Sequence, residues 1–235
     1  MRSKTYSITG LFFLSLLLVA TSFADESAIR WDSFVATNLM GRDLETSVGE
    51  YIGNIDDLAI NPSTGRIDSV LVNHVTGVGA QVVSIPFDNI SKMGDNIFVY
   101  NPPEDTYGFY EEMPYWYLGL NQLPPMREGD YKFSTLLGAS IESKEGEHAA
   151  RINDFVVNRD GHVVYVVLDE VGGGDKMVAV PFGALSMKGE HLFALDTTKE
   201  RLVEAPAFDW SDVPHLYYAT DVYRYYGLQP YWETR

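Results

Sequence analysis

Two adjacent carboxylates, Asp56 and Asp57, lie in the apolar stretch "VGEYIGNIDDLAINPSTGRID" (residues 48–68). Carboxylates beside hydrophobic residues can have perturbed pKa values, which suits general acid–base work or metal binding. The same two residues could instead be the polar half of a strand that packs against a core. The chain contains an internal comparison that separates these two interpretations.

The comparison is a repeat. The segment "LMGRDLETSVGEYIGNIDDLAIN" (residues 39–61) aligns without a gap with "LLGASIESKEGEHAARINDFVVN" (residues 136–158), at an offset of 97 positions. Further on, "VSIPFDNI" (residues 83–90) matches "VAVPFGAL" (residues 178–185). A self-similarity of this length predicts two homologous domains.

The second copy has Asn153-Asp154 where the first has Asp56-Asp57, so only the second acid recurs. A catalytic pair needs both carboxylates at a working separation. We therefore interpret Asp57 and Asp154 as outward-facing or turn-bonding residues, and we predict no catalytic residue. A hydrolase using a carboxylate pair is the weakest of our hypotheses.

Other chemistry-bearing patterns are missing from the sequence. It has no Cys, which excludes disulfides, thiolate nucleophiles and iron–sulfur clusters. The glycine-rich loops lack the Lys-Ser/Thr of a phosphate-binding loop, and no serine lies in a Gly-x-Ser-x-Gly motif. We expect no metal and no cofactor, because the five histidines are scattered without metal-ligand spacing. They are His74, His148, His162, His191 and His215.

Each copy has the pattern of short strands separated by turns. The segments "RIDSVLVN" and "HVVYVVLD" are rich in β-branched residues, and "NPSTG" and "NRDG" are typical of hairpin turns. No amphipathic helix of ten residues is evident inside either copy. Several strands in about 70 residues without helices favour a small barrel, because closure removes exposed strand edges.

These motifs resemble the photosynthetic-reaction-centre (PRC) barrel family. The resemblance rests on Leu-x-Gly at the start of each copy, Gly-Glu before the second strand, Ile-x-Asp within it, the "NPSTGRI" hairpin, and "IPF" or "VPF". It covers residues 37–103 and 133–204; the second copy departs in its shorter "NRDGHV" turn. The resemblance implies small all-β barrels, as in the H subunit of reaction centres and a ribosome-maturation factor, that act as interaction modules and not as enzymes.

We therefore expect an all-β chain of two tandem small barrels at residues 37–104 and 133–205. An aromatic-rich linker (residues 105–132) would join them, and a short helical or extended tail (residues 206–235) would follow. The segment "ATDVYRYYG" predicts a short helix with Thr220 or Asp221 as N-cap and Gly227 at its end.

The linker and the tail are both aromatic, and each contains Pro-Tyr-Trp. Each segment could wrap its own barrel, or it could form a partner-binding surface, because Tyr and Trp are favoured interface anchors. A sugar-stacking platform is a third alternative. The candidate partner-binding residues are Tyr115, Trp116, Tyr225, Tyr226, Tyr231 and Trp232. The aromatic linker, poor in serine, favours barrels that pack together.

The first 24 residues have the pattern of a signal peptide, with Arg2 and Lys4 before the apolar run of residues 8–20 and cleavage expected after Ala24. That run is shorter than the about 20 residues of a membrane span; retention as an anchor is the alternative. The full chain carries a net charge of −16, and loss of the leader removes two more bases, giving −18. Such a charge disfavours nucleic acid and anionic lipid as partners.

The function we expect is that of an exported, non-enzymatic binding or scaffold protein of a bacterial cell envelope, periplasmic or secreted. Its partner would be another envelope protein. We expect no stable insertion of the chain itself into the membrane after the leader is removed. The alternative is a periplasmic binder of a small molecule, glycan or cation in the cleft between the two barrels.

Overall fold

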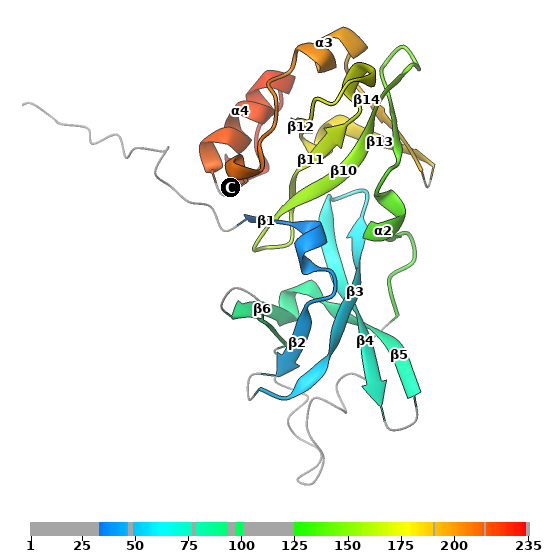
Figure 1. The fold of residues 1–235 in the computed structure, drawn as a ribbon, viewed down its shortest axis with the longest axis vertical. Helices are drawn as coiled ribbons and strands as arrows, with labels where there is room; N and C mark the ends of the chain where they lie inside the picture. The colour runs from blue at the N-terminus through cyan, green and yellow to red at the C-terminus, as the bar shows by residue number, and fades with distance from the viewer. Residues whose placement is uncertain are drawn as a thin grey trace, which may run out of the picture.

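The computed structural model describes residues 33–46, 49–76, 79–93, 97–100, 125–189, 191–213 and 215–233. Strands dominate and form two sheets of seven strands each, one per repeat (Figure 1). The prediction of an all-β chain with two tandem barrels is confirmed. The expected signal peptide lies outside the described residues.

The first barrel is built from six of its own strands in the order β5-β4-β3-β2-β7-β6, and the parallel pairing of β2 with β7 joins the first and the last of these strands along the chain. Short 3-10 helices η2 (Ala36–Leu39) and η3 (Phe87–Asn89) accompany these strands. The strands are β2 (Asp43–Thr46), β3 (Tyr51–Asn61), β4 (Arg66–Thr76), β5 (Gly79–Pro86), β6 (Ile90–Met93) and β7 (Ile97–Tyr100).

The second barrel repeats this topology in the order β12-β11-β10-β9-β14-β13, with β14 parallel to β9. The helical pieces are α2 (Phe133–Leu136), η5 (Val171–Gly173) and η6 (Phe182–Ala184). The strands are β9 (Ser140–Glu142), β10 (His148–Asn158), β11 (Val163–Asp169), β12 (Val178–Val180), β13 (Leu185–Gly189) and β14 (Leu192–Leu195).

Each repeat also gives one strand to the other. Strand β1 (Ser33–Val35) pairs with β10 of the second barrel, and β8 (Tyr131–Lys132) pairs with β3 of the first. The two pairings are equivalent at the offset of 97. These exchanged strands lie just before positions 37 and 133, where the sequence led us to expect each barrel to begin.

One hydrophobic core runs through both barrels, because buried residues of the two repeats belong to a single contiguous cluster. The two barrels lie end to end in Figure 1, with the exchanged strands at their junction. The barrels therefore pack together, as the aromatic linker favoured. Residues 101–124 of that linker lie outside the described part of the chain.

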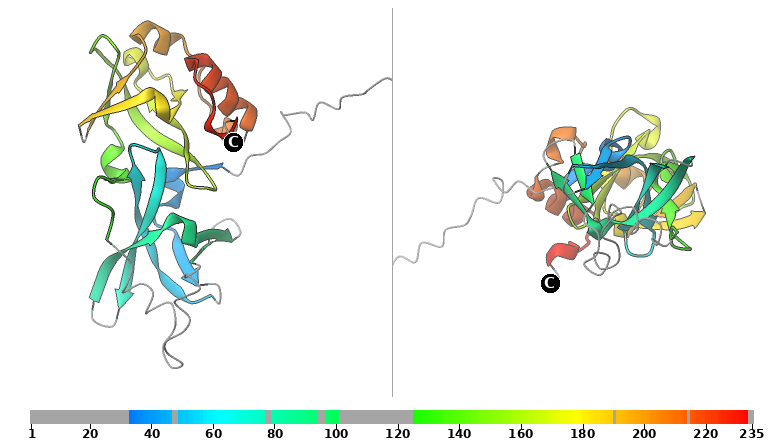
Figure 2. Two further views of the ribbon diagram at one scale, coloured as in Figure 1. Left: turned by 180° about the vertical axis from the view of Figure 1, so that it is seen from behind. Right: turned by 90° about the horizontal axis from the view of Figure 1, so that it is seen from below.

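The tail packs on the second barrel and on β1, which pairs with that barrel, and Figure 2 shows it in orange and red beside the green and yellow strands of that barrel. Its elements are α3 (Lys199–Glu204), η7 (Trp210–Asp212), α4 (Leu216–Tyr226) and η8 (Tyr231–Glu233). Buried residues of α4 form a second cluster with β10, β11 and β12. None of the described helices is long and apolar enough to cross a membrane.

Helix α4 ends as predicted, with Gly227 in the left-handed region at φ 71°. Its predicted start at Thr220 or Asp221 is wrong, since the helix begins one turn earlier after His215, which makes no capping hydrogen bond through its side chain. The hydroxyl of Thr220 instead donates to the carbonyl of Leu216 (3.0 Å). Packing against the barrel extends the helix beyond its local start signal.

Candidate functional site

The second acid of the opening pair, Asp57, is buried at the junction of the barrels with 3% of its surface exposed. A register shift between Ile55 and Asp57 in β3 rotates it inward. Its Oδ1 accepts hydrogen bonds from the backbone N–H of Leu58 (2.8 Å) and of Ser134 (3.1 Å), and its Oδ2 accepts from the Ser134 hydroxyl. Asp57 thus ties β3 to α2 of the other repeat.

Asp154 makes the equivalent contacts in the second repeat. Its Oδ1 accepts from the backbone N–H of Phe155 (2.7 Å) and Thr37 (3.3 Å), and its Oδ2 accepts from the Thr37 hydroxyl. Burial raises the pKa of Asp154, and the hydrogen bonds from Thr37 and Phe155 oppose that rise. The acid and its hydroxyl partner are each 97 positions from their counterparts, so the junction has an internal pseudo-two-fold axis.

The outward-facing interpretation of Asp57 and Asp154 is therefore wrong, because a bulge at each acid turns its side chain toward the junction. Of the pair, only Asp56 is exposed. The carboxylates of Asp57 and Asp154 accept the hydrogen bonds that join the two barrels. They are structural, as the comparison of the copies indicated.

The two hairpin tips meet at the same axis. The backbone N–H of Ile67 donates to the carbonyl of Gly161, and that of Val163 donates to the carbonyl of Gly65, both at 2.8 Å. A Cβ on Gly65 would lie 2.6 Å from the Phe182 ring. Both glycines also have φ in the left-handed region, so each is required by conformation and by contact.

The pseudo-two-fold symmetry is broken at the positions of Arg66 and Asp88. On the first side, Arg66 Nη2 donates to Asp88 Oδ1 (3.1 Å) and to the carbonyl of Asp160 (3.0 Å). At the equivalent positions on the second side stand His162 and Gly183, which cannot form this ion pair. There the structure has a hollow of about 460 Å³, named here the junction hollow.

The junction hollow is bounded by one turn of the first barrel, the second barrel and the tail. Two of its aromatic side chains, Tyr223 and Tyr231, come from the tail. The residues that line it are Pro62, Ser63, Thr64, Gly65, His162, Val163, Phe182, Gly183, Leu185, Tyr223, Leu228, Gln229 and Tyr231. None of these is acidic.

Four of the six candidate partner-binding residues are described, and all four are half-buried in the packing of the tail. The Tyr231 ring stacks on His162 at 4.7 Å, and its hydroxyl accepts from Asn158 Nδ2 (2.9 Å). Trp232 meets the ring of Tyr223 edge-on at 5.0 Å. Of the four, Tyr231 also lines the junction hollow.

The other two, Tyr225 and Tyr226, lie edge to face at 5.1 Å. The Tyr225 hydroxyl donates to the carbonyl of Arg201 (2.7 Å), and burial is the main cause that raises the pKa of Tyr226. The structure therefore brings the tail aromatics against the second barrel, as one alternative expected. Tyr115 and Trp116 lie outside the described residues.

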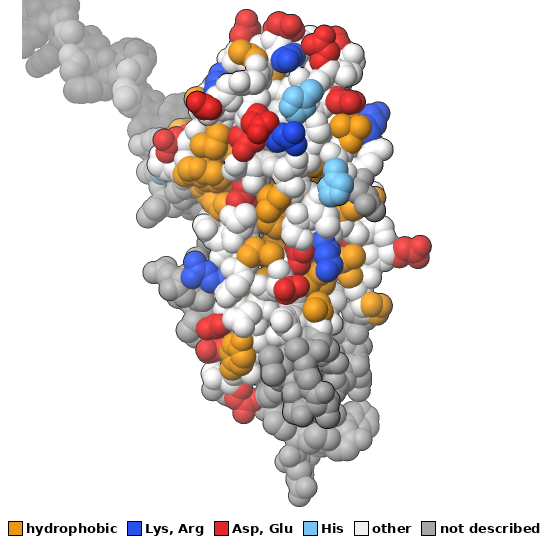
Figure 3. Space-filling model, turned by 45° about the vertical axis from the view of Figure 1, so that its right-hand side comes forward, with side chains coloured by type: hydrophobic (Ala, Val, Ile, Leu, Met, Phe, Trp, Pro, Cys, Tyr) orange, Lys and Arg blue, Asp and Glu red, His pale blue; other side chains and the backbone are white. Residues whose placement is uncertain are grey.

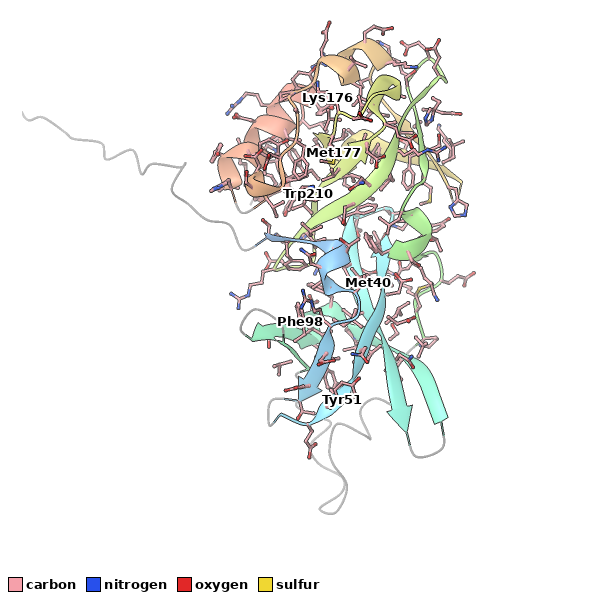
Figure 4. The ribbon with its side chains drawn as sticks, in the orientation of Figure 1. Met40, Tyr51, Phe98, Lys176, Met177 and Trp210 are labelled. Carbon is pink, nitrogen blue, oxygen red and sulfur yellow. The ribbon has the colours of Figure 1, made fainter. Side chains whose placement is uncertain are left out.

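Sequence reasoning missed Trp210, which is 41% exposed. It belongs to η7 of the tail, is labelled in Figure 4, and lies beside a second hollow of about 570 Å³, named here the Trp210 hollow. The available signal was local, because "DWS" is an Asx turn in which Asp209 accepts from the N–H of Ser211 (2.8 Å) and holds the exposed indole in place.

The charged side chains of the described residues are not gathered into one cluster. On the face shown in Figure 3, Asp and Glu side chains are scattered with Lys and Arg between them, and the described residues of that face show no continuous basic patch. Within the described ranges, no three His, Asp or Glu side chains are grouped so that they could hold a metal ion.

Comparison with known proteins agrees with this architecture. The family model of the PRC-barrel domain matches residues 32–106 and 128–202, and both matches include an exchanged strand. The ribosome maturation factor RimM of Kosmotoga olearia (strain ATCC BAA-1733 / DSM 21960 / TBF 19.5.1) is 30% identical over 92 residues, which cover 36% of this chain and 44% of that protein. The chain thus spans less than half the length of that relative. It belongs to the PRC-barrel domain family, of which it carries two tandem copies.

Proposed function

We propose that this chain is an exported, non-enzymatic binding protein of the cell envelope that acts through protein–protein interaction. The observation that carries the proposal is the use of the junction carboxylates. Asp57 and Asp154 accept bonds that hold two barrels in one body, so the groups best placed for acid–base chemistry serve assembly instead. The family supports binding, and the leader-like pattern of residues 1–24 supports export.

The net charge bears on the kind of partner. The relative from Kosmotoga olearia is named a ribosome maturation factor. A chain with a net charge of −16 would be repelled by RNA phosphates, so the proposed partner is a protein and not a nucleic acid.

The test combines location with capture. The full chain, expressed with its own leader, is fractionated and then cross-linked in intact cells, and each captured protein is purified and titrated against the mature chain. A partner that binds the purified chain saturably and is recovered from the envelope fraction supports the proposal. Failure of every captured protein to bind in isolation, or retention of the chain in the cytosol, overturns it. An acidic protein exported by the same leader is the control.

A second candidate function is favoured by the broken symmetry of the junction. Where the first side has Arg66 and Asp88, the junction hollow has His162 and Gly183, and its lining carries no carboxylate. Such a hollow suits a small neutral molecule better than a cation, since aromatic rings and uncharged polar side chains line it without a carboxylate.

The structure supplies a matched variant for this candidate. Replacing both positions, His162→Arg with Gly183→Asp, restores the ion pair of the first side and fills the hollow, and a Cβ on Gly183 would meet nothing within 4 Å. A neutral-metabolite library that raises the melting temperature of the wild type but not of the double variant supports the candidate, because ligand stabilises by mass action. Equal shifts in both proteins contradict it.

A further inference from the structure

The Trp210 hollow combines an exposed indole from the tail with hydrogen-bonding groups from residues 33–38 and from β10. Its lining brings together the strand β1, the helix η2, the bulge of β10 and the tail: Ser33, Phe34, Val35, Thr37, Asn38, Asp154, Trp210 and Val213. Its volume of about 570 Å³ lies within the range of small-molecule sites.

The indole is fixed before any ligand arrives. Asp209 accepts from both the N–H (2.8 Å) and the hydroxyl (2.6 Å) of Ser211, which closes the turn that carries Trp210. Behind it, the Phe208 ring meets the indole edge to face at 4.8 Å. An aromatic side chain that is held by its own turn and is still 41% exposed offers a ring surface with little conformational freedom left to lose.

The same lining includes polar groups that can make further hydrogen bonds. Asp154 accepts two hydrogen bonds at Oδ1 and one at Oδ2, which leaves an acceptor position on Oδ2. Asn38 is exposed, and within the described residues its side-chain amide has no recorded hydrogen bond, so it can both donate and accept. The lining contains no Lys or Arg.

We propose that the Trp210 hollow binds a neutral pyranose unit of an oligosaccharide. The apolar C–H face of the sugar stacks on Trp210, its hydroxyls donate to Asp154, and the Asn38 amide bonds a neighbouring hydroxyl. The buried carboxylate and the absence of a cation in the lining disfavour acidic sugars. The inference does not rest on the proposed protein partner, since the ligand is different and the site is centred on Trp210.

Within the described residues, this site occurs on one side of the pseudo-two-fold axis. The pseudo-symmetry axis places Asp57 and Ser134 where Asp154 and Thr37 stand, but Trp210 comes from the tail, which follows the second repeat. The hydrogen-bonding half of the site therefore belongs to the shared architecture of the junction. The tail supplies the aromatic half.

The experiment is an NMR titration of the ¹⁵N-labelled mature chain with three neutral trisaccharides: maltotriose, cellotriose and triacetylchitotriose. The indole N–H signal of Trp210 is identified by its loss in Trp210→Phe. We expect at least one trisaccharide to shift this signal saturably below about 10 mM, a concentration suited to a weak small-ligand site. We expect Trp210→Ala to weaken that binding at least tenfold and Asn38→Leu to weaken it severalfold.

Tyr217→Ala is the matched control, because Tyr217 is a tail aromatic with 38% exposure that does not line the hollow, and it should bind as the wild type does. Circular dichroism and melting temperature verify that each variant is folded. If Trp210→Ala does not fold, Asn38→Leu alone decides the test. No saturable shift with any of the three sugars overturns the proposal. Binding that survives both Trp210→Ala and Asn38→Leu also overturns it.

Discussion

Replacing Asp57 by Ala should destabilise the whole chain and not only the first barrel. The change removes the acceptor for three donors: the N–H of Leu58, and the N–H and hydroxyl of Ser134. A buried donor left without a partner costs about 1–3 kcal/mol. The Ser134 contacts are only partly buried, so water recovers some of that loss, and loss of the desolvated carboxylate offsets more. We expect the free energy of unfolding to fall by about 3 kcal/mol.

The assay is equilibrium unfolding in urea at neutral pH, followed by far-UV circular dichroism. The neighbouring Asp56→Ala is the matched control, because Asp56 is exposed and its removal should change stability by less than about 0.5 kcal/mol. A double-mutant cycle of Asp57→Ala with Ser134→Ala tests the contact between repeats, and we expect a coupling free energy of about 1 kcal/mol or more.

Two results would refute this reasoning. One is an Asp57→Ala variant as stable as Asp56→Ala, which would mean that the carboxylate is not a junction acceptor. The other is additivity of Asp57→Ala and Ser134→Ala, which would show that the two residues do not sense each other across the barrels.

Three further predictions concern the junction. Gly161→Ala should lower the free energy of unfolding by about 2–4 kcal/mol, because φ is +78° and the new Cβ would lie 2.7 Å from Phe87. In the same denaturation assay the control Gly146→Ala, with φ +79° and open space around it, should lower it by only about 1–2 kcal/mol. Burial raises the folded-state pKa of Asp154 above 3.8, so the native state holds this proton more tightly than the unfolded state does. The free energy of unfolding should therefore fall as the pH rises from 3.8 through the folded-state pKa. Asp154→Asn should flatten that part of the stability curve, and an unchanged curve would contradict the assignment. Cleavage within residues 101–124 should leave the two halves together on size exclusion, because exchanged strands join them; separation without denaturant would contradict the shared core.

The fold could be predicted largely from the sequence because the duplication supplies an internal alignment. Strand-rich segments around Asn61 and Asn158, with their turn residues, recur at a constant offset, and local chemistry explains them. The strand exchange could not be predicted, since Ser33–Val35 and Tyr131–Lys132 share only one aromatic position and their pairing depends on distant segments. Non-local pairing leaves little trace in local propensity.

The sites were harder to predict than the fold. The orientation of Asp57 and Asp154 was misjudged because a β-bulge changes which face a residue occupies, and no turn residue marks this one. Tyr231 was singled out for its type, and the structure places it on His162, a contact made by residues far apart in the chain. Trp210 was overlooked because the Pro-Tyr-Trp motif drew attention to other aromatics.

The pseudo-two-fold axis has a consequence for how such a protein can diversify. In a symmetric dimer of identical chains, every substitution appears on both sides of the axis, so a change that opens one hollow also breaks the equivalent contact on the other. Tandem copies in one chain remove that constraint. Here one side keeps the Arg66–Asp88 pair, while the other carries His162 and Gly183 beside an open hollow. One half can thus hold the assembly together while the other half is free to acquire a ligand.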